Sequence, residues 1–368
     1  CRIRRRILAE DVTLNLGKSA RVPPVPPNCG NKWGSIVNDP NVDWIASWRD
    51  PVSGVVKYAR LASSSESEQI GTKEKYDLAN KMIAITPVLR KQIAAAMGSS
   101  DRKRRHLGAI LWLVDRLALR IGSGSASSAK KAGAHGVATL LAKHVTFVDR
   151  HTIHLSFPGK DCVTYERTVK APSELVHILK DAARRKKPDE GLFDAVNSSD
   201  AAKAIDSVLP GATAKVLRTA RASELFEATL KSVSNIKSTR EAKLALLFAF
   251  TRVAILLNHR KASRASKRKL GGGDLEELDR RVVALMAEAG ATPDADAARA
   301  THMSRIGKRL REEVVSSANL SLATARGSYI HPRLVFEFGR KTGLKDPGGA
   351  TFTKKFPWAN SSASSNVL

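Results

Sequence analysis

Cysteine is scarce in this chain of 368 residues, and the three cysteines lie far apart, at Cys1, Cys29 and Cys162. No Cys-x-x-Cys pair and no histidine-rich spacing accompanies them, which argues against a zinc site and against a disulfide framework. Isolated cysteines of this kind fit a reducing compartment. We expect the protein to use neither a metal ion nor a cofactor.

The chain also lacks a long apolar run and an initiating methionine. The longest apolar stretch, near residues 244–257, is interrupted by Thr251 and Arg252 and is too short to cross a bilayer, so we expect no membrane partner. The basic residues 2–6 do not have the character of a signal peptide. The sequence therefore reads as a fragment that has lost its N-terminus and any targeting segment.

Acidic residues are few relative to basic ones. Lys and Arg number 62 against 35 Asp and Glu, for a formal charge of +27. Such an excess predicts a polyanionic partner, because phosphate neutralisation and counterion release drive binding. Charge alone leaves DNA, RNA and an anionic membrane as comparable candidates. The hydrophobic content of 42% excludes a disordered basic tail.

Apolar periodicity predicts a mainly α protein with a small β component, an α+β fold. Strands are expected at 42–48, 55–58, 144–149, 151–157 and 161–166, and helices at 73–97, 103–121 and, with breaks at Gly191 and Pro210-Gly211, across 172–260. A basic run at 261–270 and a glycine hinge at Gly271–Gly273 come next. The pattern that follows is that of two helices, each with a narrow stripe of apolar residues. It predicts an antiparallel hairpin that projects from the body.

One ordered set of polar residues predicts a specific chemistry. Tyr329 is preceded by Arg120, Lys160, Arg218 and His259. A phenol can attack a DNA phosphodiester, and the cations can hold the charge that builds on the phosphate without a metal ion. Taken singly, each residue has a commoner structural role, such as a solvated arginine or a core histidine. The prediction therefore depends on their order, spacing and local context.

Several stretches in collinear order carry a family resemblance, namely Pro26–Trp33, Val42–Trp48, Gly54–Tyr58, Asp115–Arg120, Phe157–Asp161, Thr213–Thr219, Val253–His259, Leu322–Thr324, Tyr329–Arg333 and Lys354–Ala359. In these stretches the chain resembles the eukaryotic nuclear type IB DNA topoisomerases. The similarity covers nearly the whole sequence, with residues 261–318 as its least constrained part.

The resemblance implies a role for each residue of the set. Tyr329 would be the nucleophile and would form a 3′-phosphotyrosine, releasing a 5′-hydroxyl. Arg120, Arg218 and His259 would contact the non-bridging phosphate oxygens, and Lys160 would act as general acid for the leaving 5′ oxygen from the minor groove. Further DNA contacts would come from Lys32, Trp33, Lys57, Tyr58, Asp161, Lys215, Asn258, Thr324 and Ser328.

The resemblance also implies an organisation and a setting. Residues 1–53 would be a remnant of the DNA-binding cap, 54–260 the catalytic core, 261–318 a helical linker and 319–368 the domain that carries the tyrosine. The partner would be double-stranded DNA. The protein would act as a monomer and would relax supercoils of either sign without ATP. Residence would be nuclear, with an organellar copy left open.

Departures from the family pattern leave two alternatives open. Residues 121–138 differ from the usual sequence behind Arg120, Ser328 replaces an asparagine in the pocket for camptothecin-type poisons, and His331 stands where aspartate is common. One alternative is a tyrosine recombinase, although those enzymes usually have His-x-x-Arg where this chain has Lys215-x-x-Arg218. The other is a non-catalytic basic DNA-binding descendant, which the altered 121–138 segment favours.

Overall fold

The computed structural model describes residues 5–39, 42, 44–61, 65–233, 236–261, 274–291 and 295–361. Contacts divide the chain into two compact units, Cys1–Thr72 and Lys73–Leu368. The predicted basic run beyond residue 261 and the glycine hinge at Gly271–Gly273 lie outside the described residues. Among those residues, no helix combines the length and the apolarity that crossing a membrane requires.

The first unit is built on a four-stranded sheet with the order β2-β1-β3-β4. Its strands are β1 (Val12–Asn15), β2 (Ser35–Val37), β3 (Trp44–Arg49) and β4 (Val56–Arg60), after a 3-10 turn at Ala9–Asp11. β1 pairs with β2 in parallel, and the other pairs are antiparallel.

A tight turn joins β3 to β4. The Asp50 carboxylate accepts hydrogen bonds from the backbone N–H groups of Val52 and Ser53, and Gly54 supplies the positive φ of 69° that closes the turn. The expected domain boundary between 53 and 54 therefore falls inside a paired hairpin, and the compact unit continues to Thr72.

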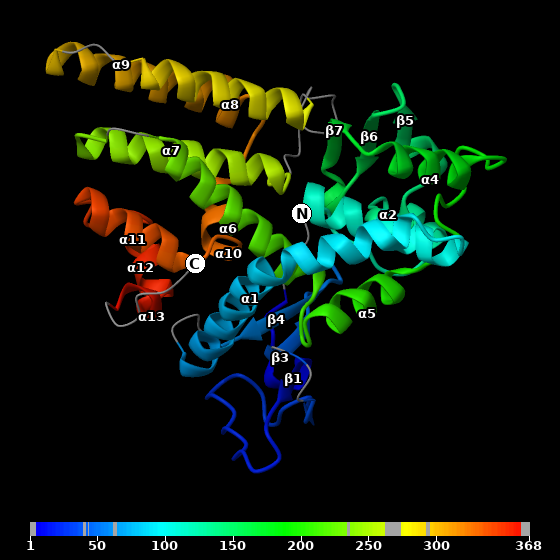
Figure 1. Ribbon diagram of the computed structural model, residues 1–368. Helices are drawn as coiled ribbons and strands as arrows, with labels where there is room; N and C mark the ends of the chain where they lie inside the picture. The colour runs from blue at the N-terminus through cyan, green and yellow to red at the C-terminus, as the bar shows by residue number, and fades with distance from the viewer. Residues whose placement is uncertain are drawn as a thin grey trace. The chain divides into compact units, whose positions relative to one another are not determined.

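The second unit is mainly helical, which confirms the predicted fold class (Figure 1). Its sheet has the order β5-β6-β7, with β5 (Val145–Phe147), β6 (Thr152–Pro158) and β7 (Thr164–Lys170). Short 3-10 turns lie at Val137–Thr139, Ala142–His144 and Lys160–Cys162. The helices are α1 (Glu66–Met97, which begins in the first unit), α2 (Arg102–Leu117), α3 (Ala126–Ala132), α4 (Ser173–Ala183), α5 (Ser198–Val208), α6 (Ala214–Ser232), α7 (Thr239–Leu256), α8 (Leu275–Gly290), α9 (Asp296–Arg309, continued by a π-helical turn at Leu310–Ser316), α10 (Leu322–Ser328), α11 (Pro332–Thr342), α12 (Ala350–Lys355) and α13 (Pro357–Asn360).

Helices α2, α6 and α7 form the centre of this unit. α6 packs against both α2 and α7, and buried side chains such as Leu113, Leu217 and Phe248 fill the contacts. α7 is apolar on most of its surface because neighbours cover it on several sides. Arg120, Arg218 and His259 of the candidate site lie at or just beyond the ends of these three helices.

α2 ends earlier than the expected 103–121. Its C-cap residue, Ala118, takes the left-handed conformation with φ 48°, which terminates the helix after Leu117. Arg120 therefore lies in a segment without regular secondary structure beyond the helix, not on its last turn. The apolar residues Leu119 and Ile121 are still buried there. The apolar periodicity therefore predicted a helix that extends past its true end at Leu117.

The strands around Lys160 form a hairpin, as predicted. β6 and β7 are in register from Thr152–Lys170 to Pro158–Thr164. β7 begins at Thr164, not at 161, because Asp161 and Cys162 adopt positive φ values of 61° and 58° in the turn. Lys160 lies at the exposed tip of this turn.

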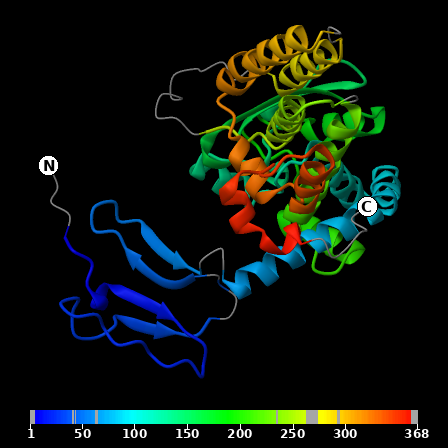
Figure 2. The ribbon, with the colours of Figure 1, turned by 90° about the vertical axis from the view of Figure 1, so that its left-hand side faces the viewer.

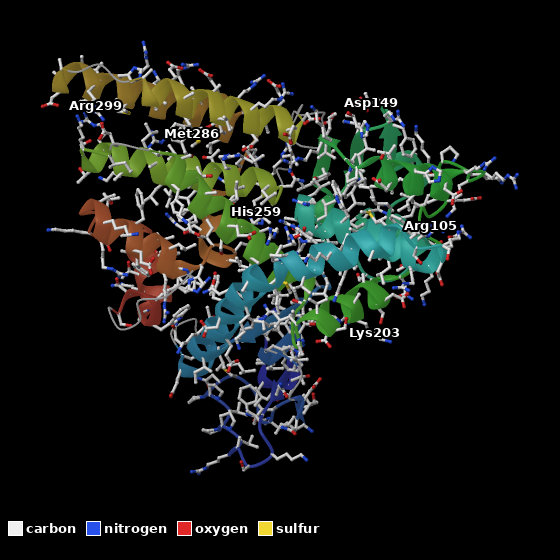
Figure 3. The ribbon with its side chains drawn as sticks, in the orientation of Figure 1. Arg105, Asp149, Lys203, His259, Met286 and Arg299 are labelled. Carbon is white, nitrogen blue, oxygen red and sulfur yellow. The ribbon has the colours of Figure 1, made fainter. Side chains whose placement is uncertain are left out.

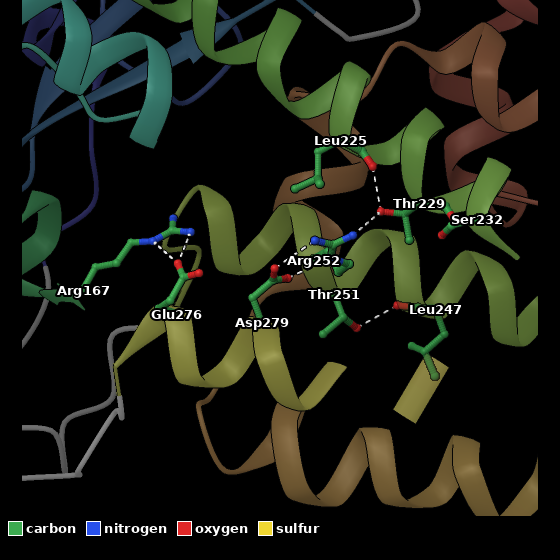
Figure 4. A network of polar contacts seen from close by, with 9 residues as sticks. All are labelled: Arg167, Leu225, Thr229, Ser232, Leu247, Thr251, Arg252, Glu276 and Asp279. Carbon is green, nitrogen blue, oxygen red and sulfur yellow. Dashed lines mark hydrogen bonds and ion pairs between the residues drawn. The ribbon is translucent and has the colours of Figure 1, made fainter. Parts of the chain in front are cut away.

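The predicted antiparallel helical hairpin exists, but it does not project from the body. α8 and α9 lie side by side and both pack along α7 (Figures 1 and 2). Ion pairs fix this contact: Arg252 of α7 binds Asp279 of α8 through two nitrogens at 2.8 Å, and Arg167 of β7 binds Glu276 (Figure 4). The apolar stripes face α7 as well as each other, so they are buried in the same core.

Candidate active site

The ends of several elements enclose one cavity in the second unit. Its volume is about 330 Å³, and its walls come from the segment after α2, the β6–β7 hairpin, the start of α6, the end of α7 and the end of α10. All the site residues predicted within this unit line it, namely Arg120, Lys160, Asp161, Lys215, Arg218, Asn258, His259, Thr324, Ser328 and Tyr329. Residues separated by more than two hundred positions in the chain are thus brought to one place.

Tyr329 lies at the junction between α10 and α11. Its side chain is 8% exposed. The Oη atom accepts a hydrogen bond of 3.1 Å from Nη1 of Arg218. The guanidinium carbon of Arg218 lies 5.0 Å from the centre of the phenol ring, and the ring of His259 lies 4.9 Å away, centre to centre. The phenol oxygen is therefore held by a guanidinium, and the phenol ring packs against an imidazole.

Arg218 is held by three separate acceptors. Besides Tyr329, its Nε donates to the carbonyl of Ala118 at 2.6 Å and its Nη2 donates to the carbonyl of Leu257 at 3.3 Å. The left-handed turn at Ala118 directs the first carbonyl toward α6, and the end of α7 supplies the second. The guanidinium therefore links the ends of α2 and α7 to the phenol.

The charges in this cavity favour an ionised phenol. Burial by itself raises the pKa of Tyr329, but the positive charges of Arg218, Arg120 and Lys215 outweigh burial and leave the pKa below its usual value. Burial also lowers the pKa of Arg218 to about 10, which still leaves the guanidinium charged at neutral pH. Positive charge next to a phenol is the arrangement that activates it as a nucleophile.

His259 follows the end of α7 (Figure 3). It is 5% exposed. Neither of its ring nitrogens has a hydrogen-bond partner among the described residues. Burial, followed by the charges of Arg218 and Arg120, lowers its pKa to about 3. The imidazole is therefore neutral at physiological pH, with one N–H free to donate to a ligand in the cavity.

The backbone around His259 connects three elements. Asn258 adopts a positive φ of 50° and donates its side-chain amide to the carbonyl of Thr164 on β7 at 3.0 Å. The carbonyl of His259 accepts from the N–H of Ser321, just before α10, at 2.6 Å. The histidine is thus fixed relative to both the Lys160 hairpin and the tyrosine helix.

Arg120 is half-buried, and its backbone is held by the segment whose sequence departs from the family pattern. The N–H of Val137 donates to the carbonyl of Arg120 at 2.9 Å, and that of Ala138 donates to Ile121 at 2.8 Å. Gly136 lies so close to the Gly122 backbone that an added Cβ would be 2.3 Å from the Gly122 nitrogen. The altered segment therefore still packs tightly behind Arg120.

The predicted site residues of the first unit are described within that unit alone. Lys32 is exposed, and the indole N–H of Trp33 donates to the carbonyl of Pro23 at 2.8 Å. Lys57 and Tyr58 are exposed neighbours on β4, with the Tyr58 ring 5.9 Å from that of Trp44. Their role in binding remains a prediction.

Sequence reasoning missed several residues at the site. His135 and Tyr165 line the cavity, and Tyr165 stacks on Phe157 with ring centres 5.0 Å apart. Lys75 of α1 donates to the carbonyl of Ser328 at 3.1 Å. The alternation of buried and exposed side chains along β7 could have placed Tyr165 on the buried face of the hairpin. No local signal identifies Lys75, because its contact with Ser328 joins residues more than two hundred positions apart.

Metal ligands do not gather at this site. Within the described ranges, no group of three or more His, Cys, Asp or Glu side chains is placed to hold a metal ion. The polar side chains that line the cavity are instead mainly cationic or hydroxylic.

The chain is similar to known proteins over most of its length. A family model for the catalytic core of eukaryotic DNA topoisomerase I matches residues 64–288, and a model for the DNA-binding fragment of the same enzyme matches residues 1–61. DNA topoisomerase 1 of Mus musculus is 27% identical over 97% of this chain and 50% of its own length. DNA topoisomerase 1 of Candida albicans and the mitochondrial DNA topoisomerase I of Rattus norvegicus are each 30% identical over 71% of this chain, and over 33% and 44% of their own lengths.

The chain spans half or less of the length of these curated relatives. The match to the core model nevertheless includes Arg120, Lys160, Arg218 and His259, four of the residues that surround the phenol. The chain therefore belongs to the eukaryotic DNA topoisomerase I family.

Proposed function

We propose that this protein is a type IB DNA topoisomerase that relaxes supercoiled double-stranded DNA through a transient tyrosyl ester. The observation that carries the proposal is the position of the Tyr329 hydroxyl. It receives a hydrogen bond from Arg218, the Tyr329 ring packs against the ring of His259, and Arg120 and Lys160 line the same cavity. A phenol beside a guanidinium in a cavity lined by further cations supports activation of the hydroxyl for attack on a phosphodiester.

The cleavage step uses these residues in fixed roles. Tyr329 loses its proton to solvent, and its Oη attacks the phosphorus as the bond from phosphorus to the 5′ oxygen breaks. Lys160 gives a proton to the departing 5′ oxygen, which leaves as a hydroxyl. The products are a 3′-phosphotyrosine and a free 5′-hydroxyl, and religation is the same step in reverse.

The charge on the transition state is held by donors already in place. Arg218 is fixed by two carbonyls, and His259 has nitrogens without partners in the described part of the chain. With Arg120, these groups would donate to the non-bridging phosphate oxygens. Preorganised donors of this kind each contribute about 10²–10³ in rate. Because arginines carry the charge, we propose that the step needs no metal ion, and because the ester keeps the bond energy, it needs no ATP.

DNA binding would rest on phosphate contacts. The net charge of +27 favours a polyanion. Asp161, Lys215, Asn258, Thr324 and Ser328 line the same cavity as the catalytic set and would position the strand. We further propose that Lys32, Trp33, Lys57 and Tyr58 extend this contact, that the protein acts as a monomer, and that it works in the nucleus or, like the mitochondrial relative, in an organelle.

The test is relaxation of supercoiled plasmid in EDTA without ATP, with Tyr329→Phe as the matched variant. We expect the parent to relax the plasmid and the variant to be inactive, because phenylalanine keeps the ring but removes the attacking oxygen. A nicked suicide duplex, which traps the covalent adduct, separates chemistry from strand rotation. Absence of an adduct with the parent would contradict the proposal and favour a DNA-binding protein without catalysis.

A further inference from the structure

Helix α10 ends immediately before Tyr329, and two lysines bind its last carbonyls. Nζ of Lys355, from α12, donates to Gly327 at 2.6 Å, and Nζ of Lys75, from α1, donates to Ser328 at 3.1 Å. The last carbonyls of a helix have no partner within the helix and carry its partial negative charge. Cations from two distant elements therefore satisfy the end of the helix that presents the phenol.

The same turn of α1 also contacts the residues after Tyr329. Lys75 lies over the ring of Tyr76, 3.9 Å from its centre. The Tyr76 ring is fully buried and lies 5.3 Å from the ring of His331 and 5.9 Å from that of Phe356, centre to centre. Residues 75 and 76 thus fix the chain on both sides of the nucleophile.

The charge of Lys75 is costly to hold in this place. Burial and the nearby charges of Lys215 on α6 and Lys355 on α12 lower its pKa to about 7. A methionine or leucine would fill the space without that cost. A residue whose protonated form is destabilised beside a reactive site is a candidate for a functional role.

We propose that Lys75 is a positioning residue for the nucleophile: with Lys355, it clamps the end of α10 and so sets where the Tyr329 hydroxyl lies relative to Arg218 and His259. This inference rests on the proposed function. Lys75 does not touch the substrate, and its effect passes through the backbone of Ser328. A displacement of about 1 Å at a reacting atom is enough to lower a rate about 100-fold.

The experiment measures single-turnover adduct formation on the nicked duplex with the full chain. Lys75→Met keeps the aliphatic stem over Tyr76 but removes the ammonium, Lys75→Arg keeps a cationic donor, and exposed Lys81 on the same helix gives the control Lys81→Met. We expect Lys75→Met to lower the rate at saturating DNA about 10- to 100-fold with little change in the DNA concentration for half-saturation. Lys75→Arg should recover most of the rate, and Lys81→Met should match the parent.

A second substrate separates positioning from proton donation. A duplex whose 5′ bridging oxygen is replaced by sulfur releases a thiolate, which needs no general acid. It should restore the rate of Lys160→Ala but not that of Lys75→Met, because a misplaced nucleophile remains misplaced. Lys355→Met should behave as Lys75→Met does, and it decides the question if Lys75→Met does not fold.

Three results would overturn the inference. The first is a parental rate for both Lys75→Met and Lys355→Met. The second is rescue of Lys75→Met by the sulfur-substituted duplex. The third is a loss of rate in Lys75→Met that Lys75→Arg does not recover, together with a lower unfolding midpoint. An adduct-forming parent is the common reference for all of them. If the parent forms no adduct, the proposed function itself fails, and the two failures are thereby distinguished.

Discussion

At the scale of single residues, Arg218 shows why the identity of the cation matters at this site. Its three nitrogens donate in three directions, to Ala118, Leu257 and Tyr329. A lysine has one nitrogen on a flexible stem and cannot reproduce this planar arrangement. Because the side chain is only 3% exposed, any carbonyl left without a donor would stay unsatisfied in the interior.

We therefore predict that Arg218→Lys lowers the single-turnover cleavage rate at least 100-fold, although it conserves charge. The variant should also raise the pH at which the rate levels off, because the cation that lowers the pKa of Tyr329 would be less well placed. Cleavage rates measured from pH 6 to 9 with a nicked duplex check both effects. A parental rate would show that charge alone suffices.

His331 explains one departure from the family pattern. Its Nδ1 accepts a hydrogen bond of 3.2 Å from the N–H of Arg333 at the start of α11. An aspartate commonly serves this N-cap role. Burial, with Arg333 and Lys75 nearby, lowers the pKa of His331 to about 3, so the imidazole is neutral and able to accept. The substitution replaces one helix cap by another.

At the scale of elements, the helical hairpin α8–α9 acts as a brace on α7. The bidentate pair between Arg252 and Asp279 is about four-fifths buried on both sides, and Arg252 also donates to Thr229 of α6 (Figure 4). In contrast, exposed basic residues such as Arg280 pair with acids on their own helix. Local pairing of this kind reduces the charge available for DNA, and we propose a bracing role for the described helices.

We predict that Asp279→Asn lowers the free energy of unfolding by about 1–3 kcal/mol, because it leaves a partly buried guanidinium without its carboxylate. Glu277→Gln removes the exposed partner of Arg280 and should change the free energy by less than about 1 kcal/mol. Urea unfolding of both variants beside the parent makes the comparison. Equal effects would mean that the hairpin is not held by the buried pair.

At the scale of the whole molecule, three buried histidines make stability depend on pH. The pKa is lowered to about 4 at His144 and to about 3 at His259 and His331, in each case chiefly by burial. In the unfolded chain these groups titrate near 6.5. As the pH falls below 6.5, the unfolded state therefore takes up protons first and the folded state loses stability.

We predict that the free energy of unfolding falls between pH 6.5 and 5, with each histidine contributing up to about 1.4 kcal/mol per pH unit. His331→Asn keeps an N-cap acceptor but cannot titrate, so its dependence on pH should be shallower by about that amount. Denaturant unfolding at pH 7, 6 and 5 gives the slopes. Parallel slopes for parent and variant would show that His331 is not neutral and buried as described.

Much of this protein was accessible from its sequence. The mainly helical fold follows from apolar periodicity, and the set from Arg120 to Tyr329 could be selected by the order of residue types, because phenol and guanidinium chemistry is a property of the side chains themselves. The β6–β7 hairpin and its exposed Lys160 were also predicted, since a Pro-Gly turn between alternating runs is a local signal.

Tertiary structure decided what no local pattern contains. The left-handed residue Ala118 ended α2 before Arg120 and supplied a carbonyl to Arg218, while packing on α7 kept the hairpin against the body. Contact with the carbonyl of Ser328 placed Lys75 next to the residue before Tyr329. Each of these contacts depends on which distant surfaces meet, and the packing of the whole core sets that. The sequence by itself determines the chemistry of the side chains and the local helices and strands that the core brings together.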